Sequence, residues 1–190
     1  MNLDANKILG SQKRSILDVQ NYSVGLKRAN QSLILSVSFS IIKGEIFGIA
    51  GESGSGKTLL TLSMFGLHNA ARLEGGDVYF DDKKIIENGI KVVDTKNLAL
   101  RIGFILQDPF SSLNPSVRIG RQIAEAIYLA KGKSPTSSEN CAAVYELLSE
   151  VGIPDPQNAY DQYPDQFSGG MRQRIVIAIA LSQDPELLIA

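Results

Sequence analysis

The sequence has little with which to build a disulfide, a metal centre or a membrane span. Its 190 residues include one cysteine, Cys141, and one histidine, His68. A lone cysteine forms no internal disulfide, and these two residues cannot complete a zinc site by themselves. The longest apolar run, Ile175–Leu181, is far shorter than the ~18 residues that a membrane helix needs. Met1–Asp4 lack the basic-then-apolar order of a secretion signal, so the cytoplasm is the expected location.

An excess of charge is also missing. The 19 basic and 20 acidic side chains give a net charge of -1, with no long run of either sign. A basic patch for nucleic acid is therefore not expected. Hydrophobic residues make up 44% and charged residues 21%, which is typical of a folded globular chain. The length favours one compact domain over two complete ones.

The first half of the chain has the pattern of an α/β fold. Alternating or fully apolar segments predict strands, and the all-apolar segment 46–50 is typical of a strand covered on both faces of a parallel sheet. Residues 58–67 carry a helical apolar stripe and end near a glycine. Over the whole chain, the expected strands cover 16–26, 32–42, 46–50, 102–106 and 187–190. A hairpin is expected at 76–86, with its turn at Asp81-Asp82.

The second half is expected to be mainly helical. Residues 120–152 predict two helices separated by the Ser/Pro/Thr stretch 134–138. A loop marked by prolines then leads to a helix that opens at Ser168 and is apolar almost all round, which predicts that it is buried. His68 is interpreted as a residue just beyond the end of the helix at 58–67.

A glycine-rich loop between an expected strand and an expected helix matches the phosphate-loop pattern G-x-x-x-x-G-K-[ST]. Its glycines let successive backbone N–H groups point inward, and the following helix adds its positive end. The lysine would reach the β- and γ-phosphates of a nucleotide, and the threonine hydroxyl would bind Mg²⁺. The eight residues are Gly51, Glu52, Ser53, Gly54, Ser55, Gly56, Lys57 and Thr58.

A second segment, Phe167–Arg174, places a serine and two glycines at the start of a helix. One interpretation is an ordinary turn with Ser168 as the N-cap residue. The other is a second phosphate contact, because the Ser168 hydroxyl, the amides of Gly169 and Gly170 and the helix N-terminus are suitable groups for a γ-phosphate.

These two segments, together with the strand end at Ile105–Pro109, resemble the ATP-binding cassette (ABC) ATPases in content and in order. The resemblance implies a P-loop NTPase core with an N-terminal antiparallel β subdomain and an inserted helical subdomain. It implies a Q-loop glutamine at Gln107, which would contact Mg²⁺ and the attacking water, and it assigns Gln107 and Lys57 to catalysis. The implied single domain divides into a core at 16–110, a Q-loop and helical subdomain at 111–166, and a signature helix with the start of the Walker B strand at 167–190.

The sequence around Gln107–Pro115 and Tyr163–Arg174 is similar to the peptide and nickel importer branch of that family. This similarity implies ATP and Mg²⁺ as cofactors, and two ATPase subunits paired head to tail, so that Ser168, Gly169 and Gly170 serve the neighbour's ATP. Further implied partners are membrane permease subunits and, indirectly, an extracytoplasmic solute-binding protein. The location would be peripheral, on the cytoplasmic face of the plasma membrane. Phe110 and Leu113 are candidates for the permease interface, with ordinary core contacts as the alternative.

Several family features are missing. The Asp-Glu pair that should follow Leu187–Ala190, with its general base, is not among these 190 residues, and neither is the family's downstream histidine. We therefore expect this chain alone to hydrolyse no ATP, and we expect two core strands without neighbours to expose apolar residues. The aromatic that stacks on adenine is replaced by Leu26, with Tyr22 as a possible substitute.

Three functions remain open from the sequence. The first is the ATP-binding subunit of an importer for peptides, nickel or a related small solute. The second is a truncated or degenerate nucleotide-binding fragment without transport activity. The third is an ABC ATPase of DNA repair or chromosome organisation, which is disfavoured because the stretch between Gln107 and Ser168 holds a compact helical subdomain instead of a long coiled coil.

Overall fold

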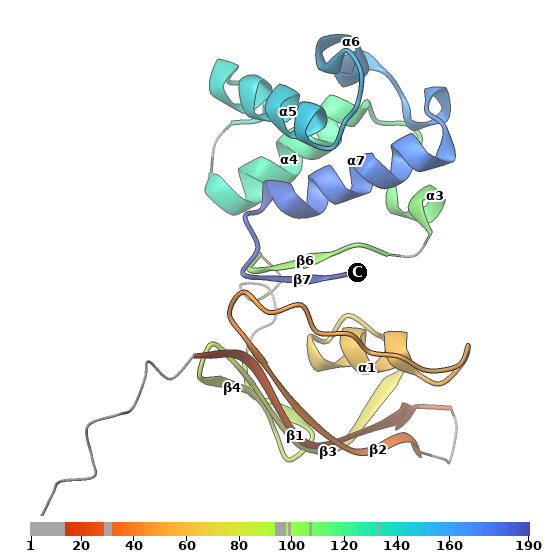
Figure 1. Cartoon of the computed structure of the whole chain (residues 1–190), viewed down its shortest axis with the longest axis vertical. Coiled ribbons are helices and arrows are strands. Elements are labelled where there is room, and N and C mark those ends of the chain that lie inside the picture. Colours follow the sequence, from red (N-terminus) through yellow and green to blue (C-terminus); the bar gives the residue numbers. More distant parts are fainter. Residues whose placement is uncertain (1–13, 29–31, 94–97, 99, 107, 133) are drawn as a thin grey trace, which may run out of the picture. The chain divides into compact units, whose positions relative to one another are not determined.

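The chain divides into a strand-rich unit, Met1–Thr95, and a helix-rich unit, Lys96–Ala190 (Figure 1). The computed structural model describes residues 14–28, 32–93, 98, 100–106, 108–132 and 134–190.

The first unit contains a five-stranded antiparallel sheet in the order β2-β1-β3-β4-β5. The predicted strands at 16–26 and 32–42 are confirmed, and so is the hairpin that turns at Asp81 and Asp82. Both aspartates have left-handed backbone angles, with φ of 50° and 61°, which suits a tight hairpin turn. The strands are β1 (Ser15–Leu26), β2 (Ser32–Ile42), β3 (Ala71–Phe80), β4 (Lys83–Glu87) and β5 (Ile90–Lys91).

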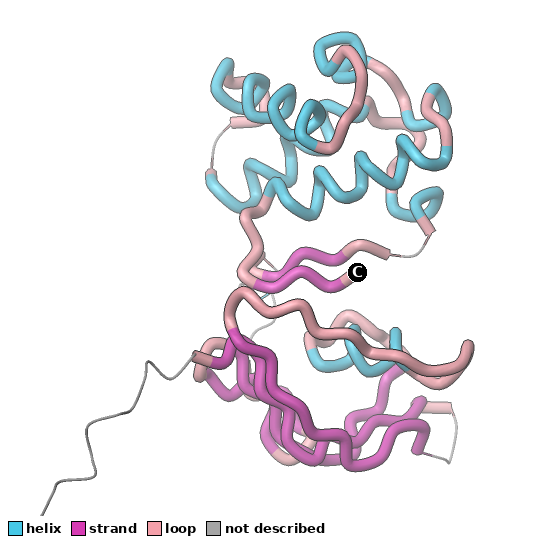
Figure 2. The backbone as a smooth tube through the Cα atoms, in the orientation of Figure 1, coloured by secondary structure: helices cyan, strands magenta, loops and turns pink. Residues whose placement is uncertain are grey.

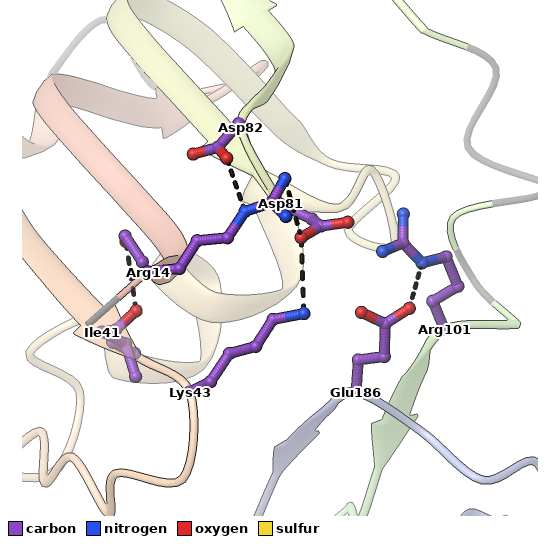
Figure 3. A network of polar contacts seen from close by, with 8 residues as sticks. Arg14, Ile41, Lys43, Asp81, Asp82, Arg101 and Glu186 are labelled. Carbon is purple, nitrogen blue, oxygen red and sulfur yellow. Dashed lines mark hydrogen bonds and ion pairs between the residues drawn. The ribbon is translucent and has the colours of Figure 1, made fainter. Parts of the chain in front are cut away.

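Ion pairs fix the hairpin turn to the neighbouring strands. Arg14 Nε donates to Asp82 Oδ2 at 2.6 Å, and Lys43 Nζ lies 3.5 Å from Asp81 Oδ1 (Figure 3). Arg14 directly precedes β1 and Lys43 directly follows β2. The contacts therefore join the start of β1, the end of β2 and the β3–β4 turn, which lie at the same end of the sheet.

One helix, α1 (Lys57–Met64), covers this sheet (Figure 1). Leu59, Leu60 and Met64 are buried, and the Tyr22 hydroxyl donates to Ser63 Oγ at 2.9 Å. Tyr22 is fully buried, and this burial raises the pKa of its hydroxyl to about 12. The helix predicted at 58–67 is confirmed but ends at Met64. His68 lies beyond that end, as expected.

The prediction of a strand at 46–50 is wrong. Residues 46–50, all of which the structure describes, adopt loop conformation (Figure 2). The Ile46 residue is 100% exposed, and Phe47 and Ile49 are also exposed. A strand needs a neighbour to bond its backbone groups, and no pairing with these residues occurs among the strands described. The expectation that apolar residues of this segment would be exposed is confirmed.

The second unit is a helical cluster with a short parallel sheet. The two helices predicted within 120–152 and the helix opening at Ser168 are confirmed. Their apolar faces meet in one core that includes Ile123, Val144, Leu148 and Ile175, each completely buried. The helices are α3 (Pro109–Ser112), α4 (Ile119–Lys131), α5 (Ser138–Glu150), α6 (Pro156–Asp161) and α7 (Gly169–Ser182), with a 3₁₀ turn, η1 (Pro164–Gln166).

The helical segment is also the crossover between two parallel strands, β6 (Ile102–Phe104) and β7 (Leu187–Ile189). A parallel pair requires such a long connection. Arg101 Nε donates to Glu186 Oε1 at 2.5 Å (Figure 3), and the Glu186 N–H donates to the Arg101 carbonyl at 2.9 Å. These contacts fix the register at the start of both strands.

Candidate functional site

The loop from Gly51 to Gly56 is curled by its glycines. Gly54 and Gly56 have φ of 81° and 92°, a region that favours glycine. A Cβ at Gly51 would lie 2.8 Å from Ser55 Oγ, so a side chain there would displace Ser55. The Ser55 N–H donates to the Glu52 carbonyl at 3.2 Å and closes the turn. Glu52 and Ser53 are exposed, and the loop has the shape that close backbone approach to a ligand requires.

Lys57 lies across this loop. Its Nζ donates to the carbonyl oxygens of Gly51 at 2.8 Å and Glu52 at 2.7 Å, and to Ser55 Oγ at 3.3 Å. Three oxygens of the loop thus hold the ammonium group over the curled backbone. A phosphate bound in the loop would meet this charge directly.

The start of α1 adds to the positive potential. Gly56 is the N-cap residue, and the first turn carries no acidic side chain, so the amide dipoles at this end are not neutralised. Thr58 is exposed in the same turn, where its hydroxyl could bind Mg²⁺. Three or more His, Cys, Asp or Glu side chains do not cluster anywhere in the described ranges. A cation here would therefore depend on Thr58 together with phosphate oxygens, a donor set that suits Mg²⁺ and ATP.

The start of α7 presents a second set of backbone donors. Ser168 is the N-cap residue, and its Oγ accepts from the Met171 N–H at 3.4 Å. Gly169 and Gly170 are exposed, and a Cβ on either would meet nothing within 4 Å. No acidic residue lies in the first turn of α7. The N-cap interpretation of Ser168 is confirmed, and the geometry is compatible with a phosphate contact.

Two arginines near this helix start received no role from the sequence. Arg172 Nε donates to the Phe167 carbonyl at 2.9 Å. Arg174 donates to the Gly152 carbonyl at 3.0 Å and the Val151 carbonyl at 3.4 Å, beyond the C-terminal end of α5. An Arg-x-Arg pattern alone does not say which carbonyl each side chain meets, so only the fold distinguishes them.

The structure also tests some of the other roles that the sequence predicted for single residues. Gln107 lies outside the described residues, and so does the side chain of Phe110. Leu113 is only 4% exposed and belongs to the helical core, so its assignment to a permease interface is wrong and the alternative of core contacts is right. Tyr22 as an adenine-stacking residue is also wrong, because it is buried and bonded to Ser63. Leu26 is partly buried at the end of β1.

Comparison with known protein families shows the family of this chain. Residues 34–190 match the family described as ABC transporter. The chain belongs to the ABC transporter family. The glycine-rich loop at 51–58, Gln107 and the start of α7 all lie within the matched range.

The curated relatives of this ABC transporter chain include peptide transport proteins. It is 36% identical to the oligopeptide transport ATP-binding protein OppD of Lactococcus lactis subsp. cremoris (strain SK11), over 94% of this chain and 53% of that protein. It is 40% identical to the dipeptide transport ATP-binding protein DppD of Bacillus subtilis (strain 168), over 92% of this chain and 52% of that protein. The chain therefore spans about half the length of the curated relatives it matches.

Solved structures support the fold. CbiO1 of Clostridium perfringens, part of the ABC transporter complex cbiONQ, matches with a TM-score of 0.72 and 24% identity, over 92% of this chain and 64% of that one. A dimeric post-hydrolysis structure of the ATP-binding cassette MJ0796, bound to ADP and Pi, matches with a TM-score of 0.74 and 24% identity, over 90% and 72%. The predicted ABC ATPase fold class is thus confirmed. Within the described residues, no helix has the length and apolar character needed to cross a bilayer.

Proposed function

We propose that the chain is the ATP-binding part of an ATPase subunit that drives an importer of peptides, nickel or a related small solute. The observation that carries this proposal is the Lys57 ammonium held over a left-handed glycine loop at the start of α1. The similarity to oligopeptide and dipeptide transport ATP-binding proteins supports the solute class.

In this proposal, the loop binds the phosphates of ATP. Gly51, Gly54 and Gly56 would let backbone N–H groups reach the β- and γ-phosphates, Lys57 would neutralise their charge, and Thr58 would bind Mg²⁺. ATP supplies the free energy when its γ-phosphate is cleaved. Glu52, Ser53 and Ser55 complete the cradle, and Gln107 would contact Mg²⁺ and orient the attacking water.

Assembly is the second part of the proposal. Ser168, Gly169 and Gly170 would contact the γ-phosphate of ATP that is bound to a second ATPase subunit, identical or related, in a head-to-tail pair. Because the shared nucleotide joins both subunits, ATP binding would favour the closed pair and hydrolysis would release it. Permease subunits would receive this movement at the cytoplasmic face of the membrane, with the solute-binding protein acting on the other side. Residues 16–110, 111–166 and 167–190 would be the core, helical and signature parts.

The first experiment measures binding of Mg²⁺ and ATP to the 190-residue chain by isothermal titration calorimetry. We expect saturable binding that weakens at least about tenfold in Lys57→Ala, which corresponds to one lost charged contact. Lys83→Ala is the matched control, because Lys83 is an exposed lysine of the same unit. Equal affinities of the wild type and Lys57→Ala would refute the loop as the nucleotide site.

A further inference from the structure

Arg172 and Arg174 lie two residues apart on α7 and make different contacts. Arg174 donates to two carbonyls just beyond α5, Val151 and Gly152, and so connects two helices of the core. Arg172 Nε instead donates to the carbonyl of Phe167, five residues earlier, on the peptide that leads into Ser168. The two arginines therefore act on different parts of the unit.

The contact of Arg172 restricts the direction of the Ser168 backbone. The Phe167 carbonyl and the Ser168 N–H belong to one planar peptide group. The Phe167 side chain is 4% exposed and anchored in the core, so its carbonyl is the part of this residue that remains to be fixed. A charged donor at 2.9 Å fixes it.

The capping contact of Ser168 is too long to do this alone. The Met171 N–H lies 3.4 Å from Ser168 Oγ, whereas the equivalent contact of Ser137, the N-cap residue of α5, is 3.1 Å. A long hydrogen bond is a weak one. The backbone of α7 fixes one side of Ser168, because the Arg172 N–H donates to the Ser168 carbonyl at 2.9 Å. The peptide on the other side is held by the Arg172 side chain, and the Ser168 hydroxyl can change partner at low cost.

The charge of Arg172 gains nothing from the dipole of α7. A cation near a helix N-terminus opposes the helix dipole, and acidic residues are the favourable choice there. The first turn of α7 contains none, while Arg172 follows directly after it. The positive end of α7 thus favours an anion beside Gly169 and Gly170.

We propose that Arg172 is a positioning residue for the signature segment: its bond to the Phe167 carbonyl orients Ser168 and the Gly169 and Gly170 amides toward the γ-phosphate of the neighbour's nucleotide. The inference rests on the proposed function for the identity of the phosphate. The orienting bond itself belongs to this chain and is tested separately.

Two substitutions isolate the hydrogen bond. Arg172→Met keeps the length of the aliphatic stem and removes every donor. Arg172→Gln restores an N–H donor after the same number of bonds as Arg Nε, without the charge. Arg174→Met is the matched control on the same helix.

The first readout is amide hydrogen exchange of Met171, measured by NMR on the 190-residue chain. We expect exchange about tenfold faster in Arg172→Met, and within about twofold of wild type in Arg172→Gln. Arg174→Met should lower the melting temperature without that local change. Wild-type exchange in Arg172→Met, or no recovery in Arg172→Gln, would overturn the inference.

The second readout is pairing of the chain in Mg²⁺ and ATP, measured by light scattering. Arg172→Met should need about tenfold more protein to pair, with nucleotide affinity of the single chain unchanged and Arg172→Gln close to wild type. Normal pairing of Arg172→Met would contradict a positioning role. Absence of pairing in the wild type would refute the shared-site part of the proposed function, while the exchange measurement would still decide whether Arg172 orients Ser168.

Discussion

The Lys57 ammonium lies 2.8 Å from the carbonyl oxygen of Gly51, the first glycine of the same loop. This contact closes the loop onto the start of α1 and keeps the cation where a phosphate would enter. The loop reaches this conformation through the positive φ angles of Gly54 and Gly56. The glycine spacing in the sequence therefore explains the curled shape of the loop.

The chain should bind ATP without hydrolysing it. Its sequence contains no Asp-Glu dipeptide, so a general base beside a metal-binding aspartate is missing from these 190 residues. We expect phosphate release in a steady-state assay to be no faster than in Lys57→Ala. Turnover clearly above that variant would show that another carboxylate acts as the base.

Ser168→Arg should abolish ATP-dependent pairing. The large cation would occupy the space in front of Gly169 and Gly170, where the neighbour's γ-phosphate is proposed to lie. Light scattering should show single chains with nearly unchanged ATP affinity. Ser137→Arg is the control, since it changes another N-cap serine of the same unit. Pairing of Ser168→Arg at wild-type strength would refute the shared site.

Tyr22→Phe should destabilise the first unit by about 1–2 kcal/mol, because it removes a buried hydrogen bond to Ser63. Urea unfolding measures the change, and a double-mutant cycle with Ser63→Ala isolates the pair. Tyr79→Phe, on the half-buried Tyr79 of β3, should cost less. A coupling energy near zero in that cycle would contradict a specific Tyr22–Ser63 contact.

Gly76→Ala should largely prevent folding of the sheet. A Cβ there would lie 2.5 Å from the Asn21 carbonyl oxygen, and φ is 87°, so the cost should reach about 3 kcal/mol or more. Gly75→Ala is the matched control, because a Cβ at Gly75 meets nothing within 4 Å. We expect that variant to stay within about 1 kcal/mol of wild type. Circular dichroism during urea unfolding compares them, and a stable Gly76→Ala protein would rule out this close approach of β1 and β3.

Asp77 should make the first unit sensitive to acid. The Asn88 N–H donates to its carboxylate at 2.8 Å, and Lys84 adds a second contact. These contacts hold the pKa of Asp77 below its ordinary value of 3.8. A lowered pKa means that the stabilisation is complete above the ordinary pKa and is lost as the pH falls through the folded-state pKa.

Urea unfolding at pH 7 and at pH 3 tests this direction. The wild type should lose stability between these values, and Asp77→Asn should be less stable at pH 7 with a smaller loss on acidification. Asp18→Asn, on the neighbouring strand β1, is the control. The same pH dependence in Asp77→Asn and wild type would contradict the proposed role of this carboxylate.

Local patterns in the sequence predicted most of the secondary structure. Alternating residues marked β1 and β2, the Asp81-Asp82 pair marked a hairpin, and Ser168 marked the start of α7, because each depends on neighbours a few residues away. The phosphate loop was equally predictable, since its glycines and lysine act within one turn of chain.

Burial and pairing were less predictable because they depend on distant residues. Tyr22 and Leu113 were assigned to surfaces, yet Tyr22 is fully buried and Leu113 is 4% exposed. The apolar segment 46–50 has the composition of a strand, but a strand exists only where another supplies its hydrogen bonds. The partners of Arg174, the carbonyls of Val151 and Gly152, are likewise distant in the sequence.

By itself, the sequence determined the four longest helices, most of the strands and the curled glycine loop before α1, because these follow from local conformational preference and from residue types at fixed spacing. It did not predict α6, which lies in the segment expected to be a loop marked by prolines. Only the tertiary structure decided which apolar residues are buried, that residues 46–50 remain outside the sheet, and that Arg174 contacts the end of α5. Those outcomes depend on contacts between segments far apart in the chain. The free energies of such contacts cannot be predicted from a local sequence pattern.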